Sequence, residues 1–359
     1  MRKTFYLLAT IPVAVVLRLL DVNPLLVFGV AALALVPAAW LMSEATEDLA
    51  AKSGPGVGGL LNVTFGNGPE LIFGFIALVD GLHEVVKASL VGSILGNGLL
   101  VLGTATAVGG WKRERQKFDR TVAQAYATML LLAVSVLLLP SLMQLVRGGG
   151  LPSVGVDNVA AEPDVHALSI CIAVLLLLSY VAGMFFSLGT HERIFNPRDE
   201  NVIDTNPGVS PWSAVGRLAL GGVLVAVTSE IMVDEISQTT KTLGISQFFL
   251  GIVVVAIVGN AAEHWVAVVA GYRNEMHLAV TITLGSSAQI ALVVAPLLAL
   301  LSYTLSTPLL LVFNPYELAA LFVAILIASY AAVEGESTWF KGVQLVSLYI
   351  AFVVLFFLA

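Results

Sequence analysis

Two short motifs place a glutamate inside an apolar stretch, directly after a glycine and an asparagine. The first is Gly66-Asn67-Gly68-Pro69-Glu70, and the second is Gly259-Asn260-Ala261-Ala262-Glu263. A carboxylate in a membrane-like environment is costly unless it is paired, hydrated or neutralised. We therefore expect Glu70 and Glu263 each to bind something, and their matching positions argue against a merely structural polar contact.

Helix-breaking residues beside the glutamates should expose backbone carbonyl groups. Pro69 has no N–H, so the carbonyl of Phe65, four residues earlier, loses its usual helical partner. Gly66 and Gly259 weaken the helix further and offer carbonyls of their own. Two carboxylates, a few carbonyls and water form an oxygen-only shell of the kind that Ca²⁺ prefers. With one cysteine and no histidine cluster, the chain offers no zinc or copper site.

The same glutamates can also carry protons. A buried carboxylate without its cation tends to take up a proton, so two protons can replace one Ca²⁺. Competition for one site that opens alternately to each side of a membrane is sufficient for antiport. His264 directly follows Glu263, and two roles stay open for it: tuning the proton affinity of the site, or bonding to a neighbouring helix.

Other polar residues near the motifs are candidates for supporting roles. Asn67 and Asn260 could contact the ion or cap the broken helix ends, and we favour capping. Ser93 and Ser286 could donate hydrogen bonds to the carboxylates or could serve as small packing residues, with equal weight. Gln289 is bulkier and costlier in an apolar environment, so we favour a functional role for it.

The two motifs belong to an internal repeat. Glu263 follows Glu70 by 193 residues, and Gly285-Ser286 follows Gly92-Ser93 at the same spacing. The sequence therefore predicts two copies of a five-helix unit. Because five is odd, the copies should enter the membrane from opposite sides, as in the inverted repeats of secondary transporters.

The composition indicates an all-α integral membrane protein. Of the 359 residues, 58% are hydrophobic and 11% are charged, against about 25% charged in ordinary soluble domains. Runs of about 20 apolar residues predict transmembrane helices. Eleven such runs occur, at about 4–20, 24–42, 56–80, 84–108, 121–141, 165–188, 212–236, 245–271, 276–301, 308–329 and 341–358.

These runs predict an N-terminal helix followed by the two inverted five-helix repeats. The expected divisions are the N-terminal transmembrane helix at 1–22, the first repeat at 23–190, a cytoplasmic connecting loop at 191–211 and the second repeat at 212–359. With the N-terminus cytoplasmic, four Lys and Arg residues fall outside, Arg18, Lys87, Arg147 and Lys241, and the other thirteen fall inside. The positive-inside rule favours this orientation, which makes the C-terminus extracytoplasmic.

Several other function classes are disfavoured. A net charge of −7 with few charged residues argues against a nucleic-acid partner. An intramembrane metalloenzyme is disfavoured because His191-Glu192 is followed by Phe195 where a second zinc-binding histidine would stand. We therefore expect a transporter and not an enzyme, with no cofactor, whose substrates are Ca²⁺ and H⁺ and whose partner is the lipid bilayer.

Four segments give the chain a resemblance to the cation/proton exchanger family, within the cation/Ca²⁺ exchanger superfamily. They are Ala45-Thr46-Glu47-Asp48-Leu49-Ala50, Gly92-Ser93-Ile94-Leu95-Gly96-Asn97, Gly259-Asn260-Ala261-Ala262-Glu263-His264 and Gly285-Ser286-Ser287-Ala288-Gln289-Ile290-Ala291-Leu292. The resemblance implies Ca²⁺ export driven by inward H⁺ movement, with Glu70 and Glu263 as the carriers of ion and proton. It also implies a supporting role for Asn97.

The resemblance leaves the coupling ion and the transported cation to be tested. Sodium-coupled exchangers of the superfamily generally carry more carboxylates and hydroxyls around the central site, whereas the second repeat here offers Ser286 and Gln289. Proton coupling is therefore favoured, with a Na⁺-coupled Ca²⁺ exchanger or an exchanger of another divalent cation as the alternative. Gly68 and Pro69 depart from the family's usual residues, which leaves selectivity open. We expect the protein in the plasma membrane of a prokaryotic cell.

Overall fold

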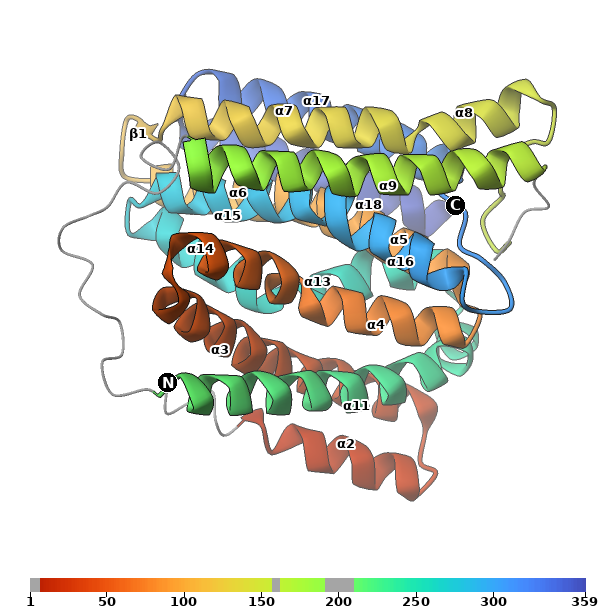
Figure 1. Cartoon of the computed structure of the whole chain (residues 1–359). Coiled ribbons are helices and arrows are strands. Elements are labelled where there is room, and N and C mark those ends of the chain that lie inside the picture. The colour runs from red at the N-terminus through yellow and green to blue at the C-terminus, as the bar shows by residue number, and fades with distance from the viewer. Residues whose placement is uncertain (1–6, 157–161, 191–209) are drawn as a thin grey trace. The chain divides into compact units, whose positions relative to one another are not determined.

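The computed structural model describes residues 7–156, 162–190 and 210–359, with the backbone alone described at 54–60, 62, 63 and 188. The described residues are almost all helical (Figure 1). They form two compact units. Unit 1 comprises 1–80, 179–244 and 258–262, and unit 2 comprises 81–178, 245–257 and 263–359. Each unit draws on both halves of the sequence, so this division is distinct from the predicted repeats, which stay a prediction.

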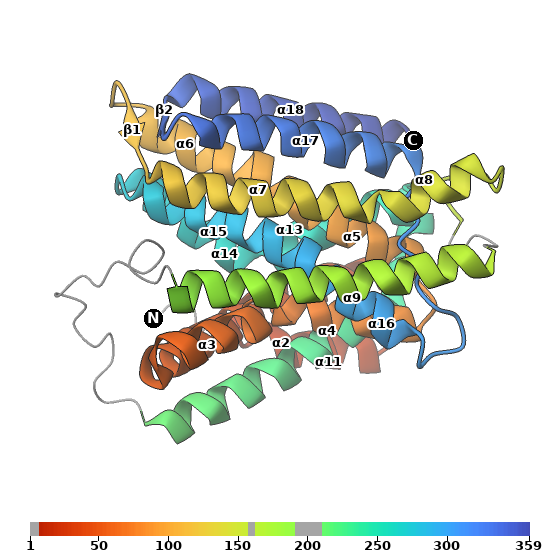
Figure 2. The ribbon, with the colours of Figure 1, turned by 45° about the horizontal axis from the view of Figure 1, so that its top comes forward.

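Unit 1 is built on two long helices, α3 (Pro24–Gly66) and α11 (Pro211–Leu243), which run alongside each other in Figures 1 and 2. The shorter helices α2 (Thr10–Leu19) and α4 (Gly68–Val79) pack against them. Helix α3 begins where the Asn23 side chain accepts a hydrogen bond from the N–H of Leu25, ahead of Pro24. A π-helical turn, η2 (Phe186–Thr190), also contacts α3.

The predicted break between 42 and 56 is wrong, because α3 continues through it. The polar stretch after Met42 contains helix-compatible residues, and its two buried polar side chains, Thr46 and Asp48, have partners within unit 1. Thr46 donates a hydrogen bond to the carbonyl of Met42, and the buried Asp48 forms an ion pair of 2.6 Å with Arg217 of α11. Polar side chains with such partners need no loop.

Unit 2 contains the remaining helices. In chain order these are α5 (His83–Leu95), η1 (Gly96–Val101), α6 (Leu102–Gly110), α7 (Arg120–Leu137), α8 (Leu139–Val146), α9 (Pro163–Phe185, shared with unit 1), α12 (Gln247–Phe249), η3 (Leu250–Val255), α13 (Ala256–Gly259, shared), α14 (Ala261–Tyr272, shared), α15 (Met276–Gln289), η4 (Ile290–Val294), α16 (Ala295–Ser302), α17 (Pro315–Val333) and α18 (Trp339–Leu358). A short antiparallel pair, β1 (Gln116–Lys117) with β2 (Glu336–Ser337), joins two connections, with Gln116 opposite Ser337.

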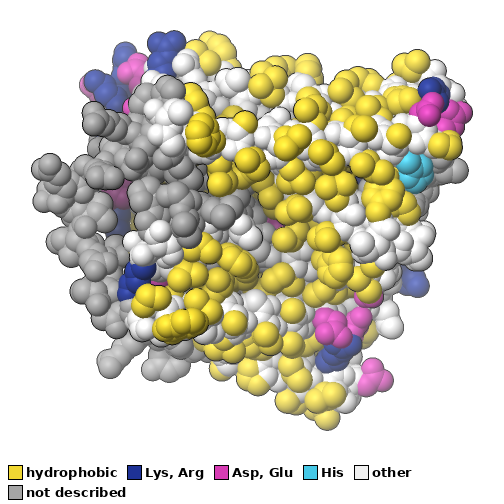
Figure 3. Space-filling view, viewed as in Figure 1, with side chains coloured by type: hydrophobic (Ala, Val, Ile, Leu, Met, Phe, Trp, Pro, Cys, Tyr) yellow, Lys and Arg dark blue, Asp and Glu magenta, His cyan; other side chains and the backbone are white. Residues whose placement is uncertain are grey.

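The helix lengths and surfaces suit a membrane. Eight helical stretches among the described residues are long and apolar enough to span one, or nine if the bent pair Gln247–Gly259 and Ala261–Tyr272 counts as one span. Helices α2 and α4 are apolar but shorter. In Figure 3 the visible surface over α7 and α8 is mostly hydrophobic, and charged side chains lie toward the two ends of this surface. The predicted total of eleven spans stays a prediction.

Part of one predicted helix is instead irregular. The run 308–329 was expected to be helical throughout, but α17 begins at Pro315 behind an Asn314 capping box. Residues 308–314 are non-helical, and Leu309 to Phe313 are buried. Side chains satisfy this backbone: Leu309 N–H donates to Ser302 Oγ at 2.7 Å and Phe313 N–H to Ser141 Oγ at 2.9 Å. Buried irregular backbone is tolerated when protein groups satisfy its hydrogen bonds in this way.

Two predicted regions fall partly outside the described residues. They are the start of the first helix, before residue 7, and the connecting loop at 191–211, of which 191–209 are not described.

Close helix packing in unit 2 gives a test of the fold. A Cβ atom added to Gly92 of α5 would lie 1.9 Å from the carbonyl oxygen of Ile252 in η3, a backbone atom that cannot move aside cheaply. We expect Gly92→Ala to cost more than the ~1–3 kcal/mol of ordinary overpacking and to lower the yield of folded protein. Gly98→Ala is the matched control, because its Cβ would find only ordinary contact at 3.8 Å. Thermal unfolding and size-exclusion chromatography check both, and equal stability of the two variants would contradict this packing.

Candidate ion-binding site

The first predicted motif forms a break between two helices of unit 1. Helix α3 ends at Gly66 and α4 begins at Gly68, so Asn67 is the single residue between them. Glu70 is the third residue of α4 and is half-buried. The N-terminus of a helix carries partial positive charge that attracts a carboxylate to this position. The predicted helix break is therefore present, and it places Glu70 in the first turn of the following helix.

The Phe65 carbonyl is not left without a donor at this break. Pro69 cannot supply the usual helical N–H, and the backbone N–H of Asn67 donates to the Phe65 oxygen instead. A carbonyl oxygen has two lone pairs, so this bond leaves one that could contact a cation. The Asn67 side chain makes no capping hydrogen bond to α4, so the favoured capping role is not observed at that helix.

The second motif forms a matching break. Helix α13 ends at Gly259, α14 begins at Ala261, and the helical stretches on either side of Asn260 are bent by 63°. Glu263 is the third residue of α14 and half-buried, as Glu70 is in α4. Asn260 itself is buried. The two glutamates thus occupy the same position relative to their helix breaks.

Within unit 1 the second break lies against the glutamate of the first motif. A Cβ atom added to Gly259 would lie 3.5 Å from Oε1 of Glu70. The absence of a side chain at Gly259 leaves the Glu70 carboxylate beside bare backbone of the second motif. Residues of the two motifs, which are offset by 193 positions in the repeat pattern, are therefore brought together at the Glu70 carboxylate.

Within unit 2 a chain of hydrogen bonds joins three of the predicted supporting residues. His264 Nε2 lies 3.1 Å from Oδ1 of Asn97 in η1, and Asn97 Nδ2 donates to Oγ of Ser286 at 3.2 Å. Asn97 and Ser286 are buried, and so is Ser93. The contact to Asn97 corresponds to the second role left open for His264, a hydrogen bond to a neighbouring helix. Gln289 is half-buried at the end of α15.

The sequence interpretation missed neighbours of these residues. Gly285 of α15 faces the ring of Tyr126 of α7, with an added Cβ 3.6 Å from the ring. Ser287 donates hydrogen bonds to the carbonyls of Thr283, at 2.9 Å, and Ile94, at 3.4 Å. Tyr126 lies in an apolar stretch with no motif around it, so the sequence carries no signal for this contact.

The donor set fits a hard cation better than a transition metal. Among the described residues, no three His, Cys, Asp or Glu side chains are grouped to hold a metal ion. A cation at these motifs would therefore need carbonyl, amide or hydroxyl oxygens beside the carboxylates. Oxygen sets of this kind suit Ca²⁺.

Acidic side chains also gather at the other end of α4. Asp80 follows the last residue of that helix, and burial raises its pKa, with the Asp234 and Glu230 carboxylates raising it further. Arg18 of α2 pairs with Asp234 and lies 3.9 Å from Glu230. This group is an electrostatic contact between helices of unit 1.

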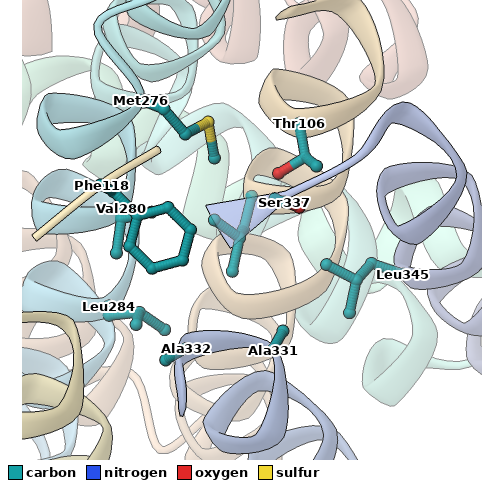
Figure 4. Close-up of a pocket in the computed structure, with 10 residues that line it drawn as sticks. Thr106, Phe118, Met276, Val280, Leu284, Ala331, Ala332, Ser337 and Leu345 are labelled. Atoms are coloured by element: carbon teal, nitrogen blue, oxygen red, sulfur yellow. The ribbon is translucent and has the colours of Figure 1, made fainter. Parts of the chain in front are cut away.

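A small pocket in unit 2 lies elsewhere and has a different character. Its polar lining groups are the hydroxyls of Thr106 and Ser337, and the remaining lining is apolar, including Phe118, Met276 and Leu345 (Figure 4). A pocket without a carboxylate or a carboxamide does not suit a divalent cation.

Known proteins resemble this chain over nearly its whole length. The family model described as sodium/calcium exchanger protein matches residues 23–189 and 213–358. The Ca²⁺/H⁺ antiporter ChaA of Bacillus subtilis is 38% identical over 365 residues, with 100% of both chains covered. The Ca²⁺/H⁺ antiporter of Aphanothece halophytica is 36% identical over 366 residues, covering 98% of this chain and 95% of its own. The solved structure of native YfkE has a TM-score of 0.83 at 34% identity and covers 99% of this chain and 100% of its own.

These matches agree with the motifs from which the sequence interpretation began. Both helix breaks fall inside the matched ranges, and so do the Gly-Ser segments of α5 and α15. The resemblance to cation/proton exchangers is confirmed, and the protein belongs to the sodium/calcium exchanger protein family of membrane transporters.

Proposed function

We propose that the protein is a secondary active antiporter that exchanges Ca²⁺ for H⁺ across the membrane by alternating access, with Glu70 and Glu263 binding Ca²⁺ or protons. The observation that carries this proposal is the approach of the two motifs in unit 1, where Gly259 lies against the Glu70 carboxylate. Relatives described as Ca²⁺/H⁺ antiporters support the choice of substrates.

The proposed ligands are the two carboxylates together with backbone carbonyls of Phe65, Gly66 and Gly259. The helix breaks at Asn67 and Asn260 interrupt the regular carbonyl-to-N–H pattern, which makes backbone oxygens available for coordination. When no cation is bound, protons neutralise the carboxylates. His264, held by Asn97, is proposed to assist this proton uptake, and Ser93, Ser286, Gln289 and Pro69 to support the site.

The proposed alternating access needs two similar halves that have opposite orientations in the membrane. We propose eleven transmembrane helices arranged as one N-terminal helix and two inverted five-helix repeats, divided as the sequence predicts. Each repeat would supply one broken helix and one glutamate. Inverted repeats of this kind let a fixed site open to either side by the movement of one part against another.

Sodium-free proteoliposomes test the exchange reaction. They are loaded at acidic internal pH, the membrane potential is clamped, and the initial rate of Ca²⁺ uptake is measured from an alkaline outside solution. We expect the rate of Ca²⁺ uptake to rise with internal proton concentration. After Ca²⁺ has left to the inside, protons must occupy the site before the site can open to the outside again. In a further arm, Na⁺ is loaded inside the vesicles. If the rate of Ca²⁺ uptake does not depend on internal pH and uptake occurs only with internal Na⁺, the protein is a Na⁺-coupled exchanger. Replacing Ca²⁺ by other divalent cations in the same assay tests selectivity.

Accessibility labelling tests the proposed orientation. The loop from Lys112 to Arg120 carries five basic residues, and we expect a cysteine there to label only from the cytoplasmic side, in a background in which Cys171 is replaced by serine. A cysteine between Gly148 and Gly155 should label from the opposite side. Labelling of both positions from one side would show that the proposed helix count is wrong.

A further inference from the structure

His83, the first residue of α5, has both ring nitrogens next to carbonyl oxygens. Nδ1 lies 2.9 Å from the oxygen of Gly81, and Nε2 lies 3.0 Å from the oxygen of Thr307. A carbonyl oxygen can only accept a hydrogen bond, so both nitrogens must carry a hydrogen for both contacts to be favourable. A neutral imidazole has a hydrogen on only one of them. Both contacts are hydrogen bonds only when the ring is an imidazolium ion.

The residues that follow His83 in α5 form a buried charged cluster with α17. Glu84 and Lys87 lie one and four positions after His83, and Glu317 is in the first turn of α17. His83, Glu84, Lys87 and Glu317 all have exposures of 6% or less. Glu84 accepts a hydrogen bond of 2.6 Å from the N–H of Gly155. The charges of Lys87 and Glu84 both act on the Glu317 carboxylate.

Charge balance in this cluster supports a cationic His83. The two carboxylates, Glu84 and Glu317, outnumber the one ammonium group of Lys87, and Oε1 of Glu317 is buried with no hydrogen-bond partner among the described residues. An uncompensated charge in an apolar interior is costly. One additional proton makes these four groups neutral. A proton on Glu317 would also do so, but only a proton on His83 makes both of its ring contacts hydrogen bonds.

The partners of His83 and Lys87 lie on one segment. His83 contacts the Thr307 carbonyl, and Lys87 Nζ donates to the carbonyl of Val312 at 3.1 Å. Both carbonyls belong to the non-helical stretch that precedes α17, so two side chains of α5 contact the backbone of this stretch at two points. Without its second N–H, the His83 ring would turn a lone pair toward a carbonyl oxygen, and one of the two contacts would become repulsive.

We propose that His83 binds a proton, separately from Glu70 and Glu263, and that this proton holds the N-terminal end of α5 against the segment Thr307–Asn314. Loss of the proton releases that segment. The proposal goes beyond the exchange reaction and does not depend on it, because none of the four residues of the cluster belongs to the proposed Ca²⁺ site.

Other titratable groups on the described parts of the surrounding elements are few. The helix α17 brings Glu317, α9 brings His166, and the turn before Thr307 brings Tyr303, whose hydroxyl lies 3.3 Å from Nδ1 of His166. Burial raises the pKa of Tyr303, so it stays neutral at physiological pH. Arg147 at the end of α8 is paired with Glu162 and Asp164. Histidine is the one residue type here that ordinarily changes charge between about pH 5 and 8.

Nuclear magnetic resonance of the full chain with ¹⁵N-labelled histidine tests the protonation state directly. The chain has five histidines, and subtracting the spectrum of His83→Gln identifies the His83 signal. At pH 7 we expect two protonated ring nitrogens for His83. His277, which is half-buried in α15, serves as the internal comparison. A neutral, single-tautomer ring for His83 at pH 7 would overturn the proposal.

A carboxylate variant tests the charge-balance argument independently of any change at His83. Glu317→Gln keeps the capping box, because glutamine can replace glutamate at that position, but it leaves one carboxylate against two cations. We expect His83 in this variant to lose its proton at a lower pH than in the native protein. Glu334→Gln is the control, because Glu334 is exposed and paired with Lys341, and it should leave the titration unchanged. No shift in Glu317→Gln would overturn the proposed coupling.

Hydrogen–deuterium exchange tests the release of the segment. Exchange in the peptide containing Thr307–Asn314 is measured from pH 6 to 8.5 and corrected for the intrinsic pH dependence of exchange. We expect protection to fall as His83 loses its proton in the native protein and to stay independent of pH in His83→Gln. Protection that changes equally in both proteins, or in neither, would show that the His83 proton does not hold the segment.

Discussion

Glu70→Gln and Glu263→Gln should each abolish Ca²⁺-driven proton movement while leaving the protein folded in the membrane. The amide keeps the shape of the carboxyl group, but it has no charge to attract Ca²⁺ and no proton to exchange. Losing a group that only supports the ligands of a metal site costs about 10- to 100-fold in affinity, so losing a carboxylate ligand should weaken Ca²⁺ binding by at least as much. Because each glutamate would also carry a proton, coupling should fail in addition to binding.

The measurement is the initial rate of proton efflux from proteoliposomes on addition of external Ca²⁺. Glu334→Gln is the matched control, since it makes the same chemical change at an exposed, ion-paired position, and it should retain the native rate. Size-exclusion profiles of all three variants establish that they are folded. Exchange at the native rate in either folded central variant would contradict the two-carboxylate mechanism.

Gly259→Leu should strongly weaken Ca²⁺ binding, whereas Gly259→Ala should be mild. An alanine Cβ at Gly259 would be in ordinary contact with Oε1 of Glu70, at 3.5 Å, so a methyl group fits without displacing the carboxylate. A leucine side chain extends further and must occupy space that the carboxylate or its bound cation needs. Forcing such atoms into a packed site costs ~1–3 kcal/mol, or roughly 5- to 150-fold in affinity.

Isothermal titration with Ca²⁺ at pH 8 compares the two variants with the native protein. The pair separates a local effect at Glu70 from a loss of fold, because both variants place a side chain at the same helix end and only leucine extends beyond the 3.5 Å contact into the space of the carboxylate. Native affinity in a folded Gly259→Leu would show that the space beside Gly259 is not part of the cation site.

The helix breaks could be predicted from sequence because their cause is local. Proline and paired glycines interrupt helices wherever they occur in an apolar run, and a glutamate that follows them falls in the next helical turn. The repeat spacing then identified the second break, although Ala261 and Ala262 are good helix formers. The predicted boundaries of several helices, such as α9 and α18, agree with the structure to within a few residues for the same reason.

The predictions from sequence were wrong where contacts between residues far apart in the chain outweighed the local sequence pattern. The polar stretch at 43–55 was interpreted as a loop, yet the ion pair of Asp48 with Arg217 lets α3 continue through it. Lys87, at the start of the predicted run 84–108, was counted among the basic residues on the outside, but it is buried in α5, where it donates to the Val312 carbonyl. Each partner lies more than 150 residues away in sequence. The Glu84 and Lys87 spacing on one helix face was the local signal that could have indicated a buried pair.

The central claim is that Ca²⁺ and protons compete for the same two glutamates, and counting protons released on Ca²⁺ binding tests it most directly. Purified protein in weakly buffered, sodium-free detergent solution is titrated with Ca²⁺ near neutral pH while proton release is followed with a pH indicator. Because cation ligands must be deprotonated, binding should release protons in the native protein. Release should fall in Glu70→Gln and in Glu263→Gln, and should stay native in Glu334→Gln. Saturable Ca²⁺ binding with no proton release, or release unchanged in both central variants, would contradict the claim.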